Sequence, residues 1–224
     1  MAKSSKKRKK KKSGGGFAVF LAVVTVIVLS VSVVYMFRHR VQKGLDGVRE
    51  KADSLIPNGF TYPTEYEEYV IKYSNEFDVD PVLVFSVIKV ESNFTPDAES
   101  SVGARGLMQL MSDAYDWVKF RLEDDSPSFD DMYDPEKNIE YGTYYLSYLM
   151  EKYDGSVDLT AAAYHCGMGM VDGWLADGTI DAENFDVADI PEENDQTAHY
   201  VNKINAAYSA YEDILAERDS TDLN

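Results

Sequence analysis

Residues 84 to 111 read VFSVIKVESNFTPDAESSVGARGLMQLM and place one carboxylate, Glu91, at the end of an apolar run. If this run is a helix, Ile88, Val87 and Val84 lie on the same face as Glu91. Loss of solvent at the edge of that apolar stripe favours the protonated carboxyl group, which suits a general acid. A solvated glutamate in the last turn of a helix is the alternative, and these residues alone leave both interpretations open.

The segment after Glu91 is rich in small residues. Gly103, Ala104 and Gly106 allow the backbone to turn tightly and to approach a ligand, and helix-forming residues return directly after them. Gln109 offers a hydrogen-bond donor and an acceptor, and Met111 offers an adaptable apolar surface. The segment is therefore a candidate ligand-binding loop, although a plain turn followed by core methionines fits the same residues.

Helical periodicity dominates the chain from Thr64 onward. Thr64 stands three residues before Glu67, as in a capping box, and Asp80-Pro81 and Asp134-Pro135 each combine an N-cap residue with a first-turn proline. Further helices are expected at 157–167, 168–175 and 195–215. Because no run shows the alternation of a strand, the sequence predicts an all-α domain over residues 64–215, followed by a flexible tail at 216–224.

The N-terminal part of the chain has the pattern of a membrane anchor. Residues 17–37 contain no charge over 21 positions, and as a helix they would be ~31 Å long, enough to cross a bilayer. Residues 1–16 carry eight basic side chains, so the positive-inside rule predicts a cytoplasmic tail and an extracellular remainder. Residues 38–63 contain two prolines and a glycine in IPNGFTYP and are expected to form a stalk.

Two other interpretations of the N-terminus have less support. A cleaved secretory signal needs a small-x-small site, which VVYMFRHR does not offer. A nuclear-localisation or nucleic-acid patch fits the basic run. Directly beside a span, the run is better suited to orientation and to contact with anionic lipid headgroups.

Charge and composition exclude several classes of protein. All 39 acidic residues follow residue 43, and 11 of the 22 basic residues precede residue 44, so residues 44–224 carry a net charge of −28. This acidity argues against a nucleic-acid surface, which needs clustered basic residues. The single cysteine, Cys166, excludes an intrachain disulfide, and the histidines at 39, 165 and 199 are too scattered to predict a metal site.

Four sequence blocks occur in a specific order: Glu91-Ser92, GARGLMQLM, DPEKNIEYGTYYLSYL and AAYHCGMGMVDGWL. Together they resemble the soluble lytic transglycosylase domain family, whose fold is related to goose-type lysozyme. The resemblance covers roughly residues 64–215 and implies a helical, lysozyme-like enzyme without a cofactor. It also implies that the binding partner is the glycan strand of peptidoglycan.

The resemblance implies a role for several residues. Glu91 corresponds to the single catalytic acid/base, and Tyr164 to the tyrosine that reaches towards this carboxylate and the reacting sugar. Asn138 and Gly142 fall on structural positions. The positions that line the sugar-binding groove correspond to Ser100, Gln109 and Met111, and Gln196 stands where the family has a glutamate.

This chain departs from the family pattern at three places. His165-Cys166 replaces an Asn-Ala pair, and Met168 replaces a proline. Near the C-terminus, IPEENDQTAHYV carries two extra residues and a glutamine, Gln196, in place of glutamate. Glu193 would replace that glutamate only if the loop shifts. These departures predict a groove of different shape around the substrate.

The resemblance also implies a reaction that needs only one carboxylate. Glu91 would protonate the oxygen between N-acetylmuramic acid and N-acetylglucosamine and would then take a proton from the C6 hydroxyl of the muramic acid. Closure of a 1,6-anhydro ring consumes no water. A lysozyme-like hydrolysis instead needs a second carboxylate that activates water, and Asp97 and Glu99 are the candidates in the loop after Glu91.

Aromatic side chains are expected to supply flat surfaces for a sugar. Of six candidates, we expect only one or two to face the substrate, because most aromatic residues at helical spacing belong to the core. The six are Tyr115, Trp117, Tyr144, Tyr145, Tyr148 and Trp174.

Two further alternatives come from other classes. In a cysteine peptidase Cys166 would need a histidine partner, but adjacent residues of a helix point about 100° apart, so His165 cannot form that pair. A peptidoglycan-binding or scaffolding protein that has lost activity is the stronger competitor, because of the changes at His165, Met168 and Gln196. Retention of Glu91 together with GLMQ favours the enzyme.

Overall fold

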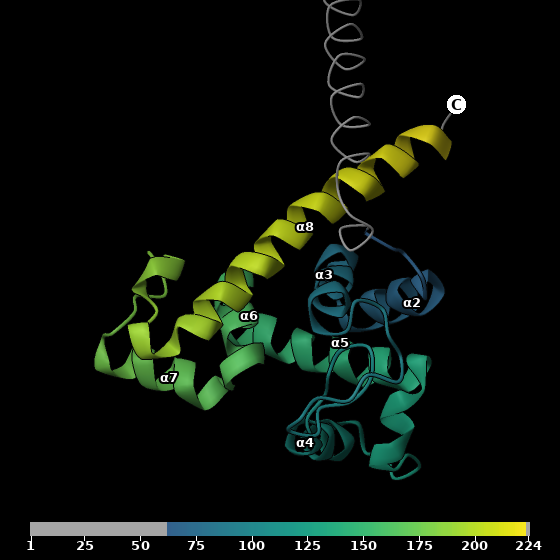
Figure 1. The fold of residues 1–224 in the computed structure, drawn as a ribbon, viewed down its shortest axis with the longest axis horizontal. Helices are drawn as coiled ribbons and strands as arrows, with labels where there is room; N and C mark the ends of the chain where they lie inside the picture. The colour runs from purple at the N-terminus through teal and green to yellow at the C-terminus, as the bar shows by residue number, and fades with distance from the viewer. Residues whose placement is uncertain (1–61, 223–224) are drawn as a thin grey trace, which may run out of the picture. The chain divides into compact units, whose positions relative to one another are not determined.

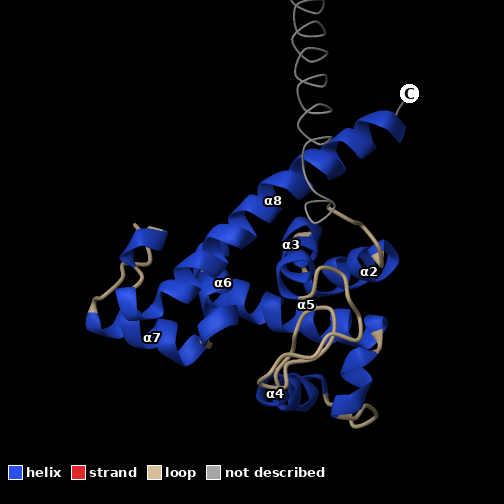
Figure 2. Ribbon diagram, in the orientation of Figure 1, coloured by secondary structure: helices blue, strands red, loops and turns tan. Residues whose placement is uncertain are grey.

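The computed structural model describes residues 62–222, which form a bundle of helices (Figure 1). The helices are α2 (Glu67–Phe77), α3 (Pro81–Glu91), α4 (Ser112–Leu122), α5 (Pro135–Lys152), α6 (Val157–Cys166), α7 (Met168–Asp177) and α8 (Asp195–Asp222). Short 3-10 turns occur at Phe129–Tyr133, Val187–Asp189 and Glu192–Asn194. Within 62–222 the only β pairing is isolated bridges in the loop after α3, so the all-α prediction is confirmed there (Figure 2).

The predicted helix starts at the two Asp-Pro pairs are confirmed. The Asp80 carboxylate accepts a hydrogen bond from the Val82 amide at 2.9 Å, and the Asp134 carboxylate accepts one from the Lys137 amide at 3.0 Å. Side-chain oxygens at an N-cap satisfy amide groups that have no carbonyl partner within the helix. These aspartates therefore fix the first turns of α3 and α5.

The predicted capping box at Thr64 is wrong. The N-cap residue of α2 is Tyr66, whose backbone is left-handed at φ 63°, and Glu67 is the first helical residue. The turn at Tyr66 starts the helix later than the spacing of Thr64 and Glu67 predicts. At the other end of the domain α8 continues to Asp222, so residues 216–222, for which we predicted a flexible tail, are helical.

Helix α3 is the centre of the core. Seven of its eleven residues, Val82 to Ile88, are buried, and it packs against α2 and α8. A helix that is apolar on all sides is buried on all sides. The sequence predicted burial of only one face of the helix before Glu91, and the buried surface is wider than that. Burial of each large apolar side chain contributes about 1.5–3 kcal/mol, which holds the helix, and thus Glu91 at its end, in a fixed place.

The remaining helices form the walls around the end of α3. Helix α6 packs against α5, α7 and α8, and α4 packs against α5. In Figure 1 the long helix α8 runs diagonally past α6 and α3, while α4 lies at the opposite side of α5.

Between Tyr62 and Asp222 no helix has both the length and the apolar character to cross a bilayer. The predicted cytoplasmic tail at 1–16, the span at 17–37 and most of the stalk at 38–63 lie outside the described residues.

Candidate active site

The surroundings of Glu91, at the end of α3, favour the protonated form of its carboxyl group. The Glu91 side chain is partly buried, and its Oε1 accepts a hydrogen bond from the Tyr200 hydroxyl at 2.7 Å. Burial raises the pKa of Glu91 to about 7 and outweighs the hydrogen bond from Tyr200, which acts to lower it. Near neutral pH this carboxyl group is therefore able both to donate and to accept a proton.

Tyr200 is the important site residue that we did not predict. It lies on α8, is only 7% exposed, and its own pKa is held well above the usual value by burial and by the charge of Glu91. The hydroxyl group therefore stays protonated and remains a donor to the carboxylate. No local sequence signal links Tyr200 to Glu91, because the two residues stand 109 positions apart in the chain.

Tyr164 lies close to the same carboxylate but uses its hydroxyl group elsewhere. Its side chain comes from α6, and its hydroxyl donates to the backbone carbonyl of Met108 at 2.7 Å. The pKa of Tyr164 is raised by burial first and by the charge of Glu91 second, which places it within electrostatic reach of the acid. The expected approach of Tyr164 towards the carboxylate is thus combined with a bond to the loop.

Two polar side chains fasten the loop to the helices around it. Ser92, the residue after Glu91, donates from its hydroxyl to the Leu107 carbonyl at 2.7 Å. Asn138 on α5 is fully buried and accepts from the Met108 amide at 2.7 Å. Its NH₂ group donates to the carbonyls of Arg105 and Met132 at 2.9 and 2.8 Å. The structural role expected for Asn138 is therefore the fixation of the loop backbone.

Two glycines allow the close approach between this loop and α5. Gly106 has a positive φ of 75°, and a Cβ atom there would overlap the carbonyl oxygen of Met132 and the side chain of Asn138. A Cβ on Gly142 would overlap the side chain of Met108. Gly106 needs glycine because of this contact with backbone and because of its own conformation, whereas a Cβ at Gly142 would require the Met108 side chain to shift.

Of the three predicted groove residues after Glu91, two hold the loop in shape. The Ser100 hydroxyl accepts from the Ala104 amide at 3.0 Å, within a turn that their backbones also close. Gln109 has a left-handed backbone at φ 47°, and its amide nitrogen donates to the carbonyls of Ala98 and Gly106 at 3.1 and 2.9 Å. Met111 is different, because it is 42% exposed.

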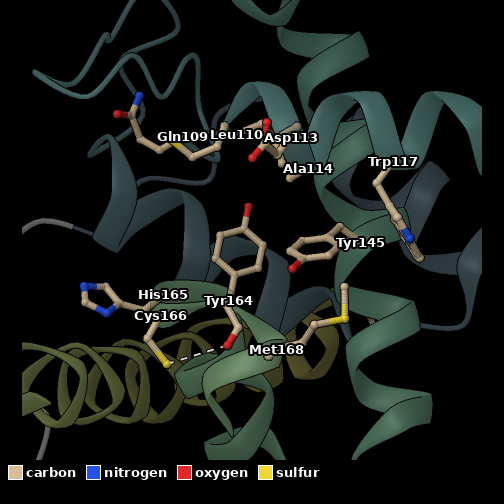
Figure 3. A pocket seen from close by; sticks show the side chains of 13 residues that line it. Gln109, Leu110, Asp113, Ala114, Trp117, Tyr145, Tyr164, His165, Cys166 and Met168 are labelled. Carbon is tan, nitrogen blue, oxygen red and sulfur yellow. Dashed lines mark hydrogen bonds between the residues drawn. The ribbon is translucent and has the colours of Figure 1, made fainter. Parts of the chain in front are cut away.

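A cavity of about 460 Å³ lies between α4 and α6 (Figure 3). Its wall brings together Gln109, Met111 and Tyr164, and it does not include Ser100 or Gln196. Two of the six aromatic candidates, Trp117 and Tyr145, also line it. The other lining residues are Leu110, Asp113, Ala114, His165, Cys166, Gly167, Met168 and Gly169.

Gln196 lines a second cavity, of about 440 Å³, on the α8 side. Tyr200 and His165 line it as well, and His165 is therefore part of the wall of both cavities. Glu91 is not among the lining residues of either cavity; it is linked to the second cavity through its hydrogen-bond donor, Tyr200. The remaining lining residues are Asp195, His199 and Lys203.

His165 and Cys166 pack against their neighbours and do not form a catalytic dyad. The Nδ1 atom of His165 lies 3.0 Å from the Thr197 hydroxyl, and its ring packs on Tyr200 with centroids 4.7 Å apart. Burial lowers the pKa of His165 and raises the pKa of Cys166, so the imidazole is neutral and the thiol protonated near neutral pH. Neither is in the state that a cysteine peptidase requires.

Sequence comparison gives a family for this arrangement. The transglycosylase SLT domain family matches residues 68–184. The soluble lytic murein transglycosylase of Salmonella typhimurium is 34% identical over 153 residues, which are 67% of this chain and 23% of that protein. The membrane-bound lytic murein transglycosylase C of Pectobacterium atrosepticum is 28% identical over 200 residues, covering 79% of this chain and 56% of that protein.

Solved structures show the same fold. The 70-kDa soluble lytic transglycosylase of Escherichia coli has a TM-score of 0.60 and 31% identity, covering 67% of this chain and 24% of that one. An inactive mutant of the lytic transglycosylase Slt from Pseudomonas aeruginosa, in which glutamine replaces a glutamate, has a TM-score of 0.61 and 26% identity over 69% of this chain and 25% of that one. The chain thus spans about a quarter of the length of the first curated relatives that it matches.

Proposed function

Because the chain belongs to the SLT transglycosylase domain family, we propose that it is a peptidoglycan lytic transglycosylase. It cleaves the β-1,4 bond between N-acetylmuramic acid and N-acetylglucosamine and leaves a 1,6-anhydro-N-acetylmuramic acid end. Glu91 is the single acid/base. The observation that carries this proposal is one carboxyl group with its pKa raised to about 7, which accepts a hydrogen bond from Tyr200, a residue that lines a cavity.

The reaction balances with one carboxyl group. Protonated Glu91 gives its proton to the glycosidic oxygen as the bond from that oxygen to the anomeric carbon breaks, and the 2-acetamido group of the muramic acid assists at that carbon. The Glu91 carboxylate then takes the proton of the C6 hydroxyl while the C6 oxygen bonds to the anomeric carbon. The enzyme returns to its starting protonation state, and no water enters the products.

Tyr200 assigns different tasks to the two carboxyl oxygens. Its hydroxyl donates to Oε1, so Oε2 is the oxygen that carries and receives the proton. The hydrogen bond also stabilises the carboxylate that remains after the first step, since a charge-assisted bond is stronger than a neutral one. This division supports the use of Glu91 first as an acid and then as a base.

Ring closure is expected to be faster than hydrolysis because the effective concentration of the C6 hydroxyl exceeds that of water. Effective molarities of well-oriented intramolecular groups reach about 10⁵–10⁸ M, far above the tens of molar of bulk water. The second carboxylate that hydrolysis needs also has weak support among the candidates in the loop. Glu99 accepts a hydrogen bond from the Tyr133 hydroxyl at 2.7 Å, and Asp97 is exposed. In this proposal the substrate groove is shaped by five residues, which are Ser100, Gln109, Met111, Tyr164 and Gln196.

Analysis of the products released from purified cell-wall sacculi tests the proposal. We expect fragments with 1,6-anhydro ends from the native chain and none from Glu91→Gln, with the helical circular dichroism of the variant unchanged. Reducing ends would instead identify a muramidase. Binding to sacculi without any release would identify a peptidoglycan-binding protein, and release by a folded Glu91→Gln variant would reject Glu91 as the acid/base.

We also propose that residues 17–37 anchor the protein in the cell membrane, with residues 1–16 in the cytoplasm. The stalk at 38–63 and the folded domain that follows it then lie outside. The charge-free run and the basic residues before it support this topology, and the name of the membrane-bound relative from Pectobacterium atrosepticum supports membrane association. Extraction of the protein by detergent but not by alkaline carbonate, with the domain accessible to protease on spheroplasts, is the expected result.

A further inference from the structure

One carboxylate stands on the wall of the cavity between α4 and α6. Asp113 is exposed in the first turn of α4, and Trp117 follows four residues later on the same helix, so both side chains face the hollow. Figure 3 shows the Asp113 carboxylate on the α4 side, with the rings of Tyr164 and Tyr145 beneath it and Met168 on the opposite side. Asp113 is not needed for the acid/base steps assigned to Glu91.

The surroundings of Asp113 favour a positively charged ligand. Among the described residues that line this cavity there is no lysine or arginine, and burial lowers the pKa of His165 so that its ring is neutral near neutral pH. A carboxylate only accepts hydrogen bonds. The net charge of −28 over residues 44–224 adds a field that attracts cations and repels carboxylates.

The other walls suit one kind of cation. Trp117 and Tyr145 line the cavity, and aromatic rings attract cations through their π electrons, as the Arg121 guanidinium 5.3 Å from the Trp117 ring centre illustrates. A carboxylate together with aromatic and apolar walls matches a primary ammonium group on a short carbon stem. A hydrated metal ion would instead require several oxygen ligands, and the described residues contain no group of three or more acidic, histidine or cysteine side chains placed to hold a metal ion.

We propose that this cavity binds a primary ammonium group of the wall substrate, with Asp113 as its counter-ion. The inference rests on the proposed function, since peptidoglycan is the substrate that would carry the group. Two parts of peptidoglycan offer it: a glucosamine that has lost its acetyl group, and the free side-chain amine of a diamino acid in a stem peptide that is not cross-linked. In either case Asp113 makes the enzyme select strands that carry free amines.

Binding measurements separate this inference from the lytic activity. Calorimetry with the full-length chain carrying Glu91→Gln measures affinity for fragments that the protein cannot cleave. The first pair of ligands is a peptide-free glycan with and without N-acetyl groups on its glucosamines. The second pair is a fully N-acetylated muropeptide whose diamino-acid amine is free or chemically acetylated.

The expected preference for the amine-bearing member of one pair is about two- to fivefold, the range for an ion pair with an exposed member. The pair that shows the preference identifies its source. Adding Asp113→Asn should abolish this preference. Adding Asp116→Asn should leave it intact, because Asp116 is an exposed aspartate of the same helix that does not line the cavity.

Three results would overturn the inference. They are equal affinity for both members of both pairs, a preference that survives Asp113→Asn, and equal loss of the preference in the two aspartate variants. A cleavage assay adds a fourth. If the native enzyme forms products with reducing ends, and of the two aspartate variants only Asp113→Asn fails to form them, Asp113 is a base that activates water and not a binding residue.

Discussion

Replacement of Glu91 by glutamine should stabilise the folded protein in a pH-dependent manner. Glutamine has the shape of the protonated side chain, and its carbonyl oxygen is still able to accept from the Tyr200 hydroxyl. Burial raises the pKa of Glu91 from 4.5 to about 7, so the proton binds more tightly to the folded protein than to the unfolded chain. The stability of the native protein therefore falls as pH rises from about 4.5 to about 7, and the loss is complete above that range.

The size of the effect follows from the same pKa. At ~1.4 kcal/mol per pKa unit, full ionisation of Glu91 costs the folded protein about 3 kcal/mol. A domain of this size shifts its melting temperature by about 2–4 °C per kcal/mol. We therefore expect the Glu91→Gln variant to melt about 6–12 °C above the native protein at pH 8 and at nearly the same temperature at pH 4.

Thermal unfolding of both proteins in mild detergent, followed by circular dichroism from pH 4 to pH 8, measures this difference. Subtracting the native curve from the variant curve removes the titration of all carboxylates that the two share. Glu193→Gln, at an exposed glutamate, is the matched control and should melt with the native protein throughout. A difference between Glu91→Gln and the native protein that does not change with pH would refute the reasoning, because burial would then not raise the pKa.

Tyr200→Phe removes the hydrogen bond that acts to lower the pKa of Glu91, so the alkaline limb of the pH profile of kcat/KM should move upward by about one pH unit, with kcat reduced about tenfold. An unchanged pH profile of kcat/KM would show that the hydrogen bond between Tyr200 and Glu91 does not form in solution. Gly106→Ala should lower the melting temperature more than Gly103→Ala does, because both have positive φ but only the former places a Cβ against a neighbour. Equal losses of melting temperature in the two variants would show that the contact of Gly106 with Met132 and Asn138 has room for a Cβ atom. Cys166→Ala should keep kcat for wall cleavage within about twofold, since burial keeps this thiol protonated. Loss of activity without loss of fold would reopen a chemical role for this residue.

Local features of the fold were predictable because their signals are local. Asp80 and Asp134 cap helices through amides two or three residues away, which is a spacing that the sequence shows directly. The late start of α2 depends instead on the left-handed turn at Tyr66, a conformation that is uncommon for a large side chain. The burial of α3 on nearly all sides depends on α2 and α8 and exceeds the stripe that one helix face predicts.

The site shows the same division. Glu91 was proposed from its position after an apolar run, with support from the family pattern. Its hydrogen-bond donor, Tyr200, stands 109 positions later in the chain, and only the fold brings the two together. Residue type identified Ser100 and Gln109 as polar groove residues. Their hydrogen bonds to the backbone of their own loop cannot be inferred from residue type, because the same groups bind water or ligand equally well.

The attachment of the Leu107-Met108 backbone to three helices has a consequence for the geometry of the proposed proton transfer. Ser92 from the end of α3, Asn138 from α5 and Tyr164 from α6 all bond to these two peptide units. These bonds join the loop to the end of the helix that carries Glu91 and to α5 and α6. If Glu91 is the acid of the proposed reaction, movement of the end of α3 would carry the loop with it, and the gap between Glu91 and a bound sugar would change less than either position. Since catalysis depends steeply on the separation of the reacting atoms, this shared attachment would, in the proposed reaction, hold a larger fraction of bound strands in a geometry from which they can react.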